Sequence, residues 1–409
     1  MALCTAAAVA RDDAVTRTTS KEQTRAWARW CKFIKLIEYD EDEFLDELPS
    51  EAKNYLLSCF AQAEREALFS HKTITRLVAG TVRSTVDYVS QTFRDYGRHD
   101  PRLDKDGKVA RLLSKQYKGY KNQDPPEKQQ KAIPACVIKT LHDNKGSTLS
   151  QAISALSTVA LFFAMRSCEY SKVPQSEDRK TKVIRVKDVQ FFMNGSYLAH
   201  SDKELPQADF VTITFVDQKN GERMESVTQF CTNDRVLCPV RAAATIVKRI
   251  RAIPSTTEET TINAYIDQSK KLTYVTSKQV KDALRAAVAT IGESKLGFSS
   301  SEVGTHSIRS GAAMAMHLAE VPVYTIMIIG RWSSDAFLRY IRKQVAQFSQ
   351  NIAQRMLSTQ NYFHVSSFDQ RVSHLDPRQR NNPNNAQTRR NLGNNPSGQS
   401  RLPAFALWT

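Results

Sequence analysis

The chain has 409 residues, more than a single hydrophobic core usually supports, so we expect at least two domains. Lysine and arginine number 58 against 42 aspartates and glutamates, and the net charge of +16 favours a polyanionic partner, nucleic acid before an acidic membrane surface. The sequence contains no apolar run of the roughly 18 residues that a membrane-spanning helix needs, so we expect no membrane partner. Because its start also lacks the features of a secretory signal, we expect an intracellular protein.

The seven cysteines are odd in number and scattered, without a C-x-x-C spacing. This pattern indicates neither a disulfide framework nor a zinc ribbon. We therefore expect reduced thiols, most of them buried, and no metal site.

The N-terminal part has the apolar spacing of an all-helical domain, for which we predict residues 19–120. Residues 1–18 lack this periodicity and are predicted to be a flexible N-terminus. Order is expected to begin at Ser20, where S-K-E-Q matches a capping box. The predicted helices run from Ser20 to about Ile37 and over residues 50–66, 73–96 and 107–117.

Residues 102–134 form a basic stretch with nine basic and four acidic side chains. A Pro-Pro pair interrupts this stretch, and residues 121–134 are predicted to be the linker to a second domain. Tyr117 and Tyr120 lie between lysines. The net positive charge of the stretch favours contact with phosphate groups, while a solvated linker without a ligand is the open alternative. The candidate DNA-binding residues are Lys115, Lys118 and Lys121.

The second part, residues 135–362, combines helices with a small antiparallel sheet. Alternating apolar residues predict strands in 182–192 and 209–230, the latter folded back at the Asn220-Gly221 turn. The predicted fold class is mainly α with a small antiparallel β-sheet. The helical patterns cover 135–143, 148–166, 239–252 and 277–291, and helices with short turns continue to about residue 359.

Two pairs of charged residues in this part could do chemistry. His306 and Arg309 are three residues apart and therefore share one face of a predicted helix, although such a pair alone is more typical of a surface or an ion pair. Arg166 ends a long apolar run, where its charge needs a partner or a ligand. Glu169 is the obvious partner, and a purely structural Arg166–Glu169 pair is the alternative.

Arginines gathered around a tyrosine suit attack on a phosphodiester. Guanidinium groups bind the non-bridging oxygens and stabilise the charge that develops in the transition state, so neither a metal nor another cofactor is needed. A phenol is a poor nucleophile at neutral pH, so Tyr340, the candidate nucleophile, needs these cations and a proton acceptor, for which His306 is the candidate. Lys219, beside the hairpin turn, is the candidate proton donor to the leaving 5′ oxygen.

Taken together, these residues resemble the tyrosine recombinase (phage integrase-type) family. The stretches H-S-I-R-S-G at 306–311 and G-R-W-S-S-D-A-F-L-R-Y-I at 330–341 are similar to motifs of the Crypton and DIRS recombinases of eukaryotic mobile elements. The similarity covers about residues 20–360. It implies a helical, SAM-like core-binding domain followed by an α+β catalytic domain that cleaves and rejoins DNA strands.

The resemblance also implies roles for individual residues. Arg166 and Arg309 would bind the scissile phosphate, and Tyr340 would form a 3′-phosphotyrosine link. The family places its nucleophile nine residues after a His or Trp that contacts the phosphate, whereas Tyr340 follows Trp332 by eight residues and Arg331 by nine, so this position stays open between the two. The full set of implied site residues is Arg166, Lys219, His306, Arg309, Trp332 and Tyr340, supported by Glu169 and Arg331.

As partners, the resemblance implies double-stranded DNA and further copies of the chain, a dimer on each site and a synaptic tetramer, in a host nucleus or, in a prokaryote, the cytoplasm. Family members donate a C-terminal helix to a neighbouring subunit, and residues 347–359 are the candidate here, with packing inside the same chain as the alternative. Residues 363–409 are rich in asparagine and arginine and are expected to be disordered. Two other functions stay open, a catalytically inactive DNA-binding protein derived from a mobile element and a type IB topoisomerase-like strand transferase.

Some residues compete with these assignments. Tyr324 lies in an apolar helix and is predicted to be a core residue rather than a nucleophile, and Tyr362 is a weaker rival. His200 and His317 have no matching partners and are predicted to lie on the surface or in the core. The lysines that compete with Lys219 are Lys180, Lys182 and Lys187.

Overall fold

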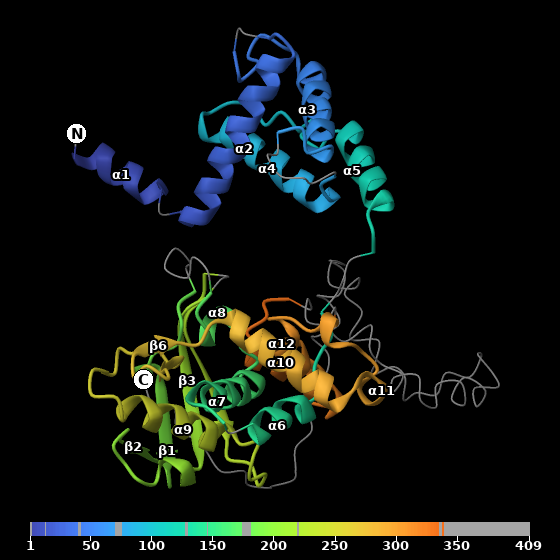
Figure 1. The fold of residues 1–409 in the computed structure, drawn as a ribbon. Helices are drawn as coiled ribbons and strands as arrows, with labels where there is room; N and C mark the ends of the chain where they lie inside the picture. The colour runs from blue at the N-terminus through green and yellow to red at the C-terminus, as the bar shows by residue number, and fades with distance from the viewer. Residues whose placement is uncertain are drawn as a thin grey trace, which may run out of the picture. The chain divides into compact units, whose positions relative to one another are not determined.

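The computed structural model describes residues 2–12, 14–39, 42–69, 76–126, 130–144, 146–173, 181–218, 221–334 and 338. Within them, buried apolar side chains form one core between Ala26 and Tyr120 and a larger one between Ile133 and Ala312. We call residues 14–126 the helical part and residues 130–338 the α+β part (Figure 1). Among the described helices, none is both long enough and apolar enough to cross a bilayer.

The N-terminal helices largely follow the predicted periodicity. Thr16 caps the second helix, because its hydroxyl accepts a hydrogen bond from Thr19 N at 3.2 Å, so this helix begins before Ser20. The stretch predicted to be a flexible N-terminus contains a further helix, which alanine, the strongest helix former, explains. The helices are α1 (Ala2–Asp12), α2 (Arg17–Leu36), α3 (Ser50–Arg65), α4 (Ala79–Asp95) and α5 (Arg111–Gln123).

Aromatic rings from three helices fill the core of the helical part. Trp30 of α2 is fully buried, and its ring meets Phe60 of α3 and Phe93 of α4 edge to face, with centroids 5.3 and 6.2 Å away. The indole N–H donates to the carbonyl oxygen of Glu43 at 2.8 Å, so no polar atom of this side chain is buried without a partner.

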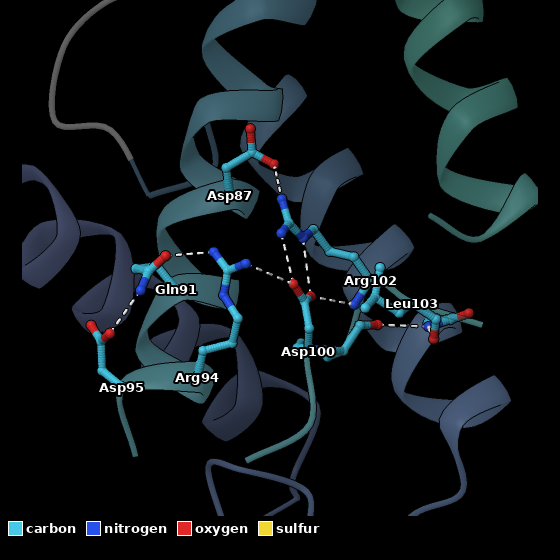
Figure 2. A network of polar contacts seen from close by, with 9 residues as sticks. Asp87, Gln91, Arg94, Asp95, Asp100, Arg102 and Leu103 are labelled. Carbon is cyan, nitrogen blue, oxygen red and sulfur yellow. Dashed lines mark hydrogen bonds and ion pairs between the residues drawn. The ribbon is translucent and has the colours of Figure 1, made fainter. Parts of the chain in front are cut away.

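A network of charged side chains fixes the loop between α4 and α5 (Figure 2). The carboxylate of Asp100 accepts from Arg102 Nε at 3.0 Å and from Arg102 Nη2 at 2.7 Å, and it lies 3.7 Å from Arg94 Nη1. Arg102 also donates to Asp87 of α4. The basic stretch at 102–134 is therefore folded into the helical part as far as the end of α5, which includes the first three residues of the predicted linker.

The α+β part contains a four-stranded and a two-stranded sheet together with helices, and its elements follow in chain order. The first group is α6 (Ala135–Asp143), α7 (Thr148–Phe162), α8 (Ser167–Tyr170), the 3-10 turn η2 (Val186–Asp188), β1 (Val189–Met193), β2 (Ser196–Leu198), η3 (Leu205–Gln207), β3 (Phe210–Asp217) and β4 (Arg223–Phe230). The second group is α9 (Pro239–Arg251), β5 (Ala264–Ile266), β6 (Leu272–Tyr274), α10 (Ser277–Ile291), α11 (Glu293–Leu296), η4 (Ser300–Glu302), α12 (Ser307–Leu318) and α13 (Val323–Gly330).

The larger sheet has the strand order β2-β1-β3-β4, with antiparallel pairing throughout. Its β3–β4 hairpin, in register from Phe210 opposite Phe230 to Asp217 opposite Arg223, confirms the prediction from alternating residues. The inward side chains of β3 are buried, and α9 packs against β3, β4 and α7. The predicted fold class, mainly α with a small antiparallel sheet, is confirmed.

Two predicted boundaries in this part are wrong. The strand expected at 182–192 is regular only from Val189, because Asp188 accepts hydrogen bonds from the backbone and side chain of Arg185 and closes a 3-10 turn there. The helix expected at 148–166 ends at Phe162, because Ala164 adopts a left-handed backbone with φ 45°.

The cysteines are less buried than predicted. Only Cys168 and Cys238 are buried, while Cys4, Cys136 and Cys231 are exposed. No disulfide is present among these thiols, although Cys231 Sγ lies 3.6 Å from Cys238 Sγ.

Candidate functional site

The turn between α7 and α8, residues 163–166, is the centre of the candidate site. Because α7 ends at Phe162, Arg166 does not continue that helix but becomes the N-cap of the short helix α8. Glu169 accepts hydrogen bonds from Arg166 Nη1 at 2.9 Å and from the Arg166 backbone N at 2.8 Å. The predicted Arg166–Glu169 pair is therefore present, and the side chain of Arg166 keeps 17% of its surface exposed.

Glu169 also binds a second arginine, which sequence reasoning left without a defined contact. Arg331 Nη2 donates to Glu169 Oε2 at 2.8 Å, and both side chains are 99% buried, with 1% relative exposure each. Arg331 ends α13 in a left-handed conformation, φ 54° and ψ 50°. Glu169 thus joins two guanidinium groups from segments more than 160 residues apart in the sequence.

The surroundings of Arg331 are those of a structural ion pair. Its Nη1 donates to the carbonyl oxygens of Phe163 and Ile329, both at 3.1 Å, and its Cζ lies 3.5 Å from the centroid of the Phe215 ring. Burial lowers the pKa of Arg331 below its usual value, and the carboxylate of Glu169 opposes this shift. We conclude that the charge of Arg331 is compensated inside the protein.

Arg309 reaches the same turn from α12. Its guanidinium donates to the carbonyl oxygens of Ala164 and Gly330, and only 3% of the residue is exposed. Arg309 therefore binds the backbone of the turn that ends in Arg166. Arg309 is far more buried than a residue that only binds a surface ligand needs to be, so it also holds the 163–166 turn and the end of α13.

Trp332 lies beside Arg309, whose Cζ is 4.3 Å from the centroid of the indole ring. The ring also covers Gly330 so closely that a Cβ on this glycine would lie 1.6 Å from a ring carbon. The spacing of the motif left the His/Trp position open between Arg331 and Trp332. Arg331 pairs with Glu169, whereas the side chain of Trp332 lies against Arg309. The half-buried ring also packs against two clusters of buried apolar residues.

His306 immediately precedes α12 and is exposed, while Arg309 three residues later is buried. The His306 backbone N donates to Gln130 Oε1 at 2.9 Å, and its carbonyl oxygen accepts from Ser310. The predicted shared helical face is therefore not found, because His306 precedes the helix and is exposed, whereas Arg309 lies within it and is buried.

Lys219 and Tyr340 lie outside the described residues, as do Lys180, Tyr362, the predicted exchange helix 347–359 and the predicted tail. The residues next to the first two are described. Gln218 is buried, with its Oε1 3.5 Å from Arg166 Nη1 and its amide nitrogen donating to Glu225. Leu338 packs against the small core of Ala313 and Ile326.

Sequence reasoning missed Gln218 and Glu225, which connect β3 and β4 to Arg166. Glu225 lies on the inward face of β4 by alternation. A charged residue at an inward position looks, in the sequence alone, like a break in the alternation, so no local pattern identifies it as part of the site. It was wrong about Tyr324, which is 74% exposed instead of buried. Tyr324 lines a cleft of about 250 Å³ together with Glu225, Arg331 and Trp332.

The other residues that compete for the site assignments, as far as the structure describes them, have contacts of their own in the α+β part. Lys187 forms a surface ion pair with Glu259, and Lys182 lines a cavity beside Glu169. His200 is buried between Glu258 Oε2 at 2.8 Å and the Val189 carbonyl oxygen at 2.6 Å, which agrees with the prediction of a surface or core residue.

The candidate DNA-binding lysines lie on α5 and are all exposed, on the side of the helix away from the buried Leu113 and Tyr120. Among the described ion pairs none involves these three side chains. Among all the residues that the structure describes, no group of three or more histidine, cysteine or carboxylate side chains could hold a metal ion. The three residues are Lys115, Lys118 and Lys121.

Comparison with known proteins gave matches among solved structures alone. No family model matches the sequence, and no curated protein matches it. The chain is similar to the Tn1549 transposon integrase in complex with transposon right end DNA, with 11% identity, a TM-score of 0.46, and coverage of 86% of this chain and 97% of that one.

Two further similar structures are also complexes with DNA. One is the XerH site-specific recombinase on its difH substrate, with 12% identity, a TM-score of 0.41, and coverage of 76% of this chain and 71% of that one. The other is a lambda integrase dimer on a COC′ core site, with 11% identity, a TM-score of 0.39, and coverage of 77% and 88%.

Proposed function

We propose that this protein is a site-specific DNA recombinase that cleaves and rejoins DNA strands through a covalent 3′-phosphotyrosine intermediate on Tyr340. The observation that carries the proposal is the meeting of Arg166 and Arg309 at the 163–166 turn, although they are far apart in the sequence. The motifs around His306 and Tyr340 that resemble tyrosine recombinases support the same conclusion. Mobile-element integration or excision is the role that this resemblance favours.

Arg166 is the residue best suited to bind the scissile phosphate. Its guanidinium is partly exposed, and one of its nitrogens is held by Glu169, which is itself fixed by Arg331. A guanidinium held in this way loses little side-chain freedom when it binds a phosphate oxygen, so more of the interaction stabilises the transition state. The indole N–H of Trp332 would add a phosphate contact, while Arg309, whose guanidinium binds two carbonyl oxygens, would hold the turn that positions Arg166.

The proton transfers are assigned by chemistry. A tyrosine hydroxyl must lose its proton as it attacks phosphorus, and the exposed imidazole of His306 is the acceptor. The 5′ oxygen must gain a proton as it leaves, and Lys219 is the donor. The phosphotyrosine bond keeps the energy of the broken phosphodiester, so rejoining needs no nucleotide.

Binding to duplex DNA is assigned to the basic surface of α5, in a core-binding domain that precedes the catalytic domain. Exposed lysines without a partner carboxylate attract phosphates and release condensed counterions, so affinity should fall steeply with salt. We further propose a dimer on each site and a synaptic tetramer, acting in the nucleus of the host. The lysines concerned are Lys115, Lys118 and Lys121.

A duplex carrying a nick beside the cleavage site tests this function, because loss of the short 5′-hydroxyl strand traps the covalent adduct. We expect an adduct that resists denaturation, maps to Tyr340 by mass spectrometry, and disappears in Tyr340→Phe and Arg166→Ala. DNA binding without any adduct would support the inactive DNA-binding alternative instead. Relaxation of supercoiled plasmid by monomers, without joining of two sites, would support a topoisomerase.

A further inference from the structure

The chain enters the α+β part through residues 130–134, the entry segment, which lies along the residues that precede α12. Lys131 N donates to the Glu302 carbonyl oxygen at 2.9 Å, and Ile133 N donates to the Ser307 carbonyl oxygen at 3.3 Å. A Cβ on Gly311 would lie 2.2 Å from the Ile133 carbonyl oxygen, so α12 approaches the segment as closely as a glycine permits. The contacts lie on both sides of His306 in the sequence.

Within this arrangement, the side-chain amide of Gln130 lies directly against Gly304. A Cβ on Gly304 would be 2.2 Å from Gln130 Cδ and 2.4 Å from its Oε1 and Nε2. The same Oε1 accepts the hydrogen bond from His306 N at 2.9 Å. The backbone N–H of an N-cap residue needs an acceptor, which in a capping box is the side chain of the third helical residue. Here that residue is Arg309, whose side chain can only donate, so Gln130 supplies the acceptor from outside the helix.

The backbone of His306 is therefore held from two directions. Gln130 binds its N–H, while its carbonyl oxygen accepts from both Ser310 N and Ser310 Oγ at 2.9 Å. The direction in which the exposed imidazole leaves the backbone depends on these contacts.

We propose that Gln130 is a positioning residue for His306, so that the segment through which the chain enters the α+β part sets the orientation of the proton-accepting imidazole. This proposal rests on the proposed function of His306. Gln130 touches neither substrate nor reacting atoms in this scheme, and it acts only through the backbone of His306.

A double-mutant cycle tests the contact, with Gln123→Ala at the exposed end of α5 as the matched control. Alanine is compatible with the backbone at Gly304, which does not have a left-handed φ, so Gly304→Ala acts by displacing the Gln130 amide. We expect Gln130→Ala and Gly304→Ala each to slow formation of the covalent adduct about tenfold in single turnover, with DNA affinity unchanged. The double variant should be no slower than Gln130→Ala, because the two changes remove the same contact.

Two readouts separate positioning from general loss of structure. Gln130→Glu keeps an acceptor oxygen and should restore the rate, and the acidic limb of the rate–pH profile should move in Gln130→Ala but not in Gln123→Ala. Strictly additive losses, or a Gln130→Ala enzyme as fast as the parent, would overturn the proposal.

Failure of the proposed function would look different, since no variant, nor the parent, would form an adduct. In that case the rate at which diethyl pyrocarbonate modifies His306, measured by peptide mass spectrometry against His99, still tests the contact. We expect this modification rate to increase about threefold in Gln130→Ala and in Gly304→Ala, because each variant loses the hydrogen bond to the His306 backbone. Unchanged modification rates in both variants would refute the role of Gln130.

Discussion

Replacement of Glu169 by alanine should destabilise the α+β part strongly. The carboxylate accepts hydrogen bonds from Arg166 and Arg331, and both it and Arg331 are 1% exposed. Without it, Arg331 is left as a buried cation surrounded by carbonyl oxygens and the Phe215 ring. Removing one partner of a buried ion pair typically costs about 3–5 kcal/mol, which for a unit of this size lowers the melting temperature by about 10 °C.

Urea unfolding monitored by circular dichroism measures this loss, and two further variants make the interpretation specific. Glu259→Ala removes a carboxylate that pairs with Lys187 and Arg185 but is 60% exposed, so it should cost much less stability than Glu169→Ala. Replacing Arg331 by methionine in the Glu169→Ala background removes the orphaned charge and should recover part of the stability. If Glu169→Ala cost no more than Glu259→Ala, the buried pair would not stabilise this turn and the reasoning would be refuted.

Three other predictions test the packing, the charge network and the proposed DNA surface. In urea unfolding, Gly311→Ala should lower the free energy of unfolding by about 2 kcal/mol, because the new Cβ would meet a backbone carbonyl oxygen. Gly119→Ala in α5 should raise it by up to about 1 kcal/mol, because the new Cβ has no atom within 4 Å. Changes of the same sign in both variants would contradict this packing. Burial tends to raise the pKa of Asp100, but hydrogen bonds and charge from Arg102 lower it below its usual value, so this stabilisation is complete above about pH 4 and is lost as the pH falls through the lowered pKa. Asp100→Asn should therefore make stability less dependent on pH below about pH 4, and an unchanged pH profile would exclude this contribution. Fluorescence anisotropy with duplex DNA should show that alanine at three lysines of α5 reduces the slope of log affinity against log salt by roughly 2–3, and an unaltered slope would mean that α5 does not contact phosphates. These lysines are Lys115, Lys118 and Lys121.

Local pattern was sufficient where neighbours in sequence are also neighbours in space. The β3–β4 hairpin follows from alternating apolar residues, which must face the core together in one register. The pairing of Arg166 with Glu169 follows from a separation of three residues within a single helical turn. The capping box at the start of α10, where Thr276 and Gln279 bind each other's backbone, follows in the same way.

Local sequence patterns failed where the direction of a side chain depends on residues far away in the sequence. Tyr324 lies in an apolar run, yet it is exposed, because α13 has only eight residues and turns other side chains toward the core. Arg331 was open to a role at the phosphate, but its left-handed backbone directs the guanidinium to Glu169. Gln130 carries no motif at all, and its importance depends on a glycine far along the chain.

By itself, the sequence determined the mainly helical class with a small antiparallel sheet, the hairpin and the residue types of the candidate site, because hydrophobic period and turn chemistry act over a few residues. The tertiary structure decided that Arg309 and Arg331 both turn to the carbonyl oxygens of residues 163–166, and that Arg166 alone of these three arginines keeps a surface. The physical reason is that a buried guanidinium must find acceptors wherever the fold provides them, and these acceptors come from backbone that lies more than 140 residues away in the chain.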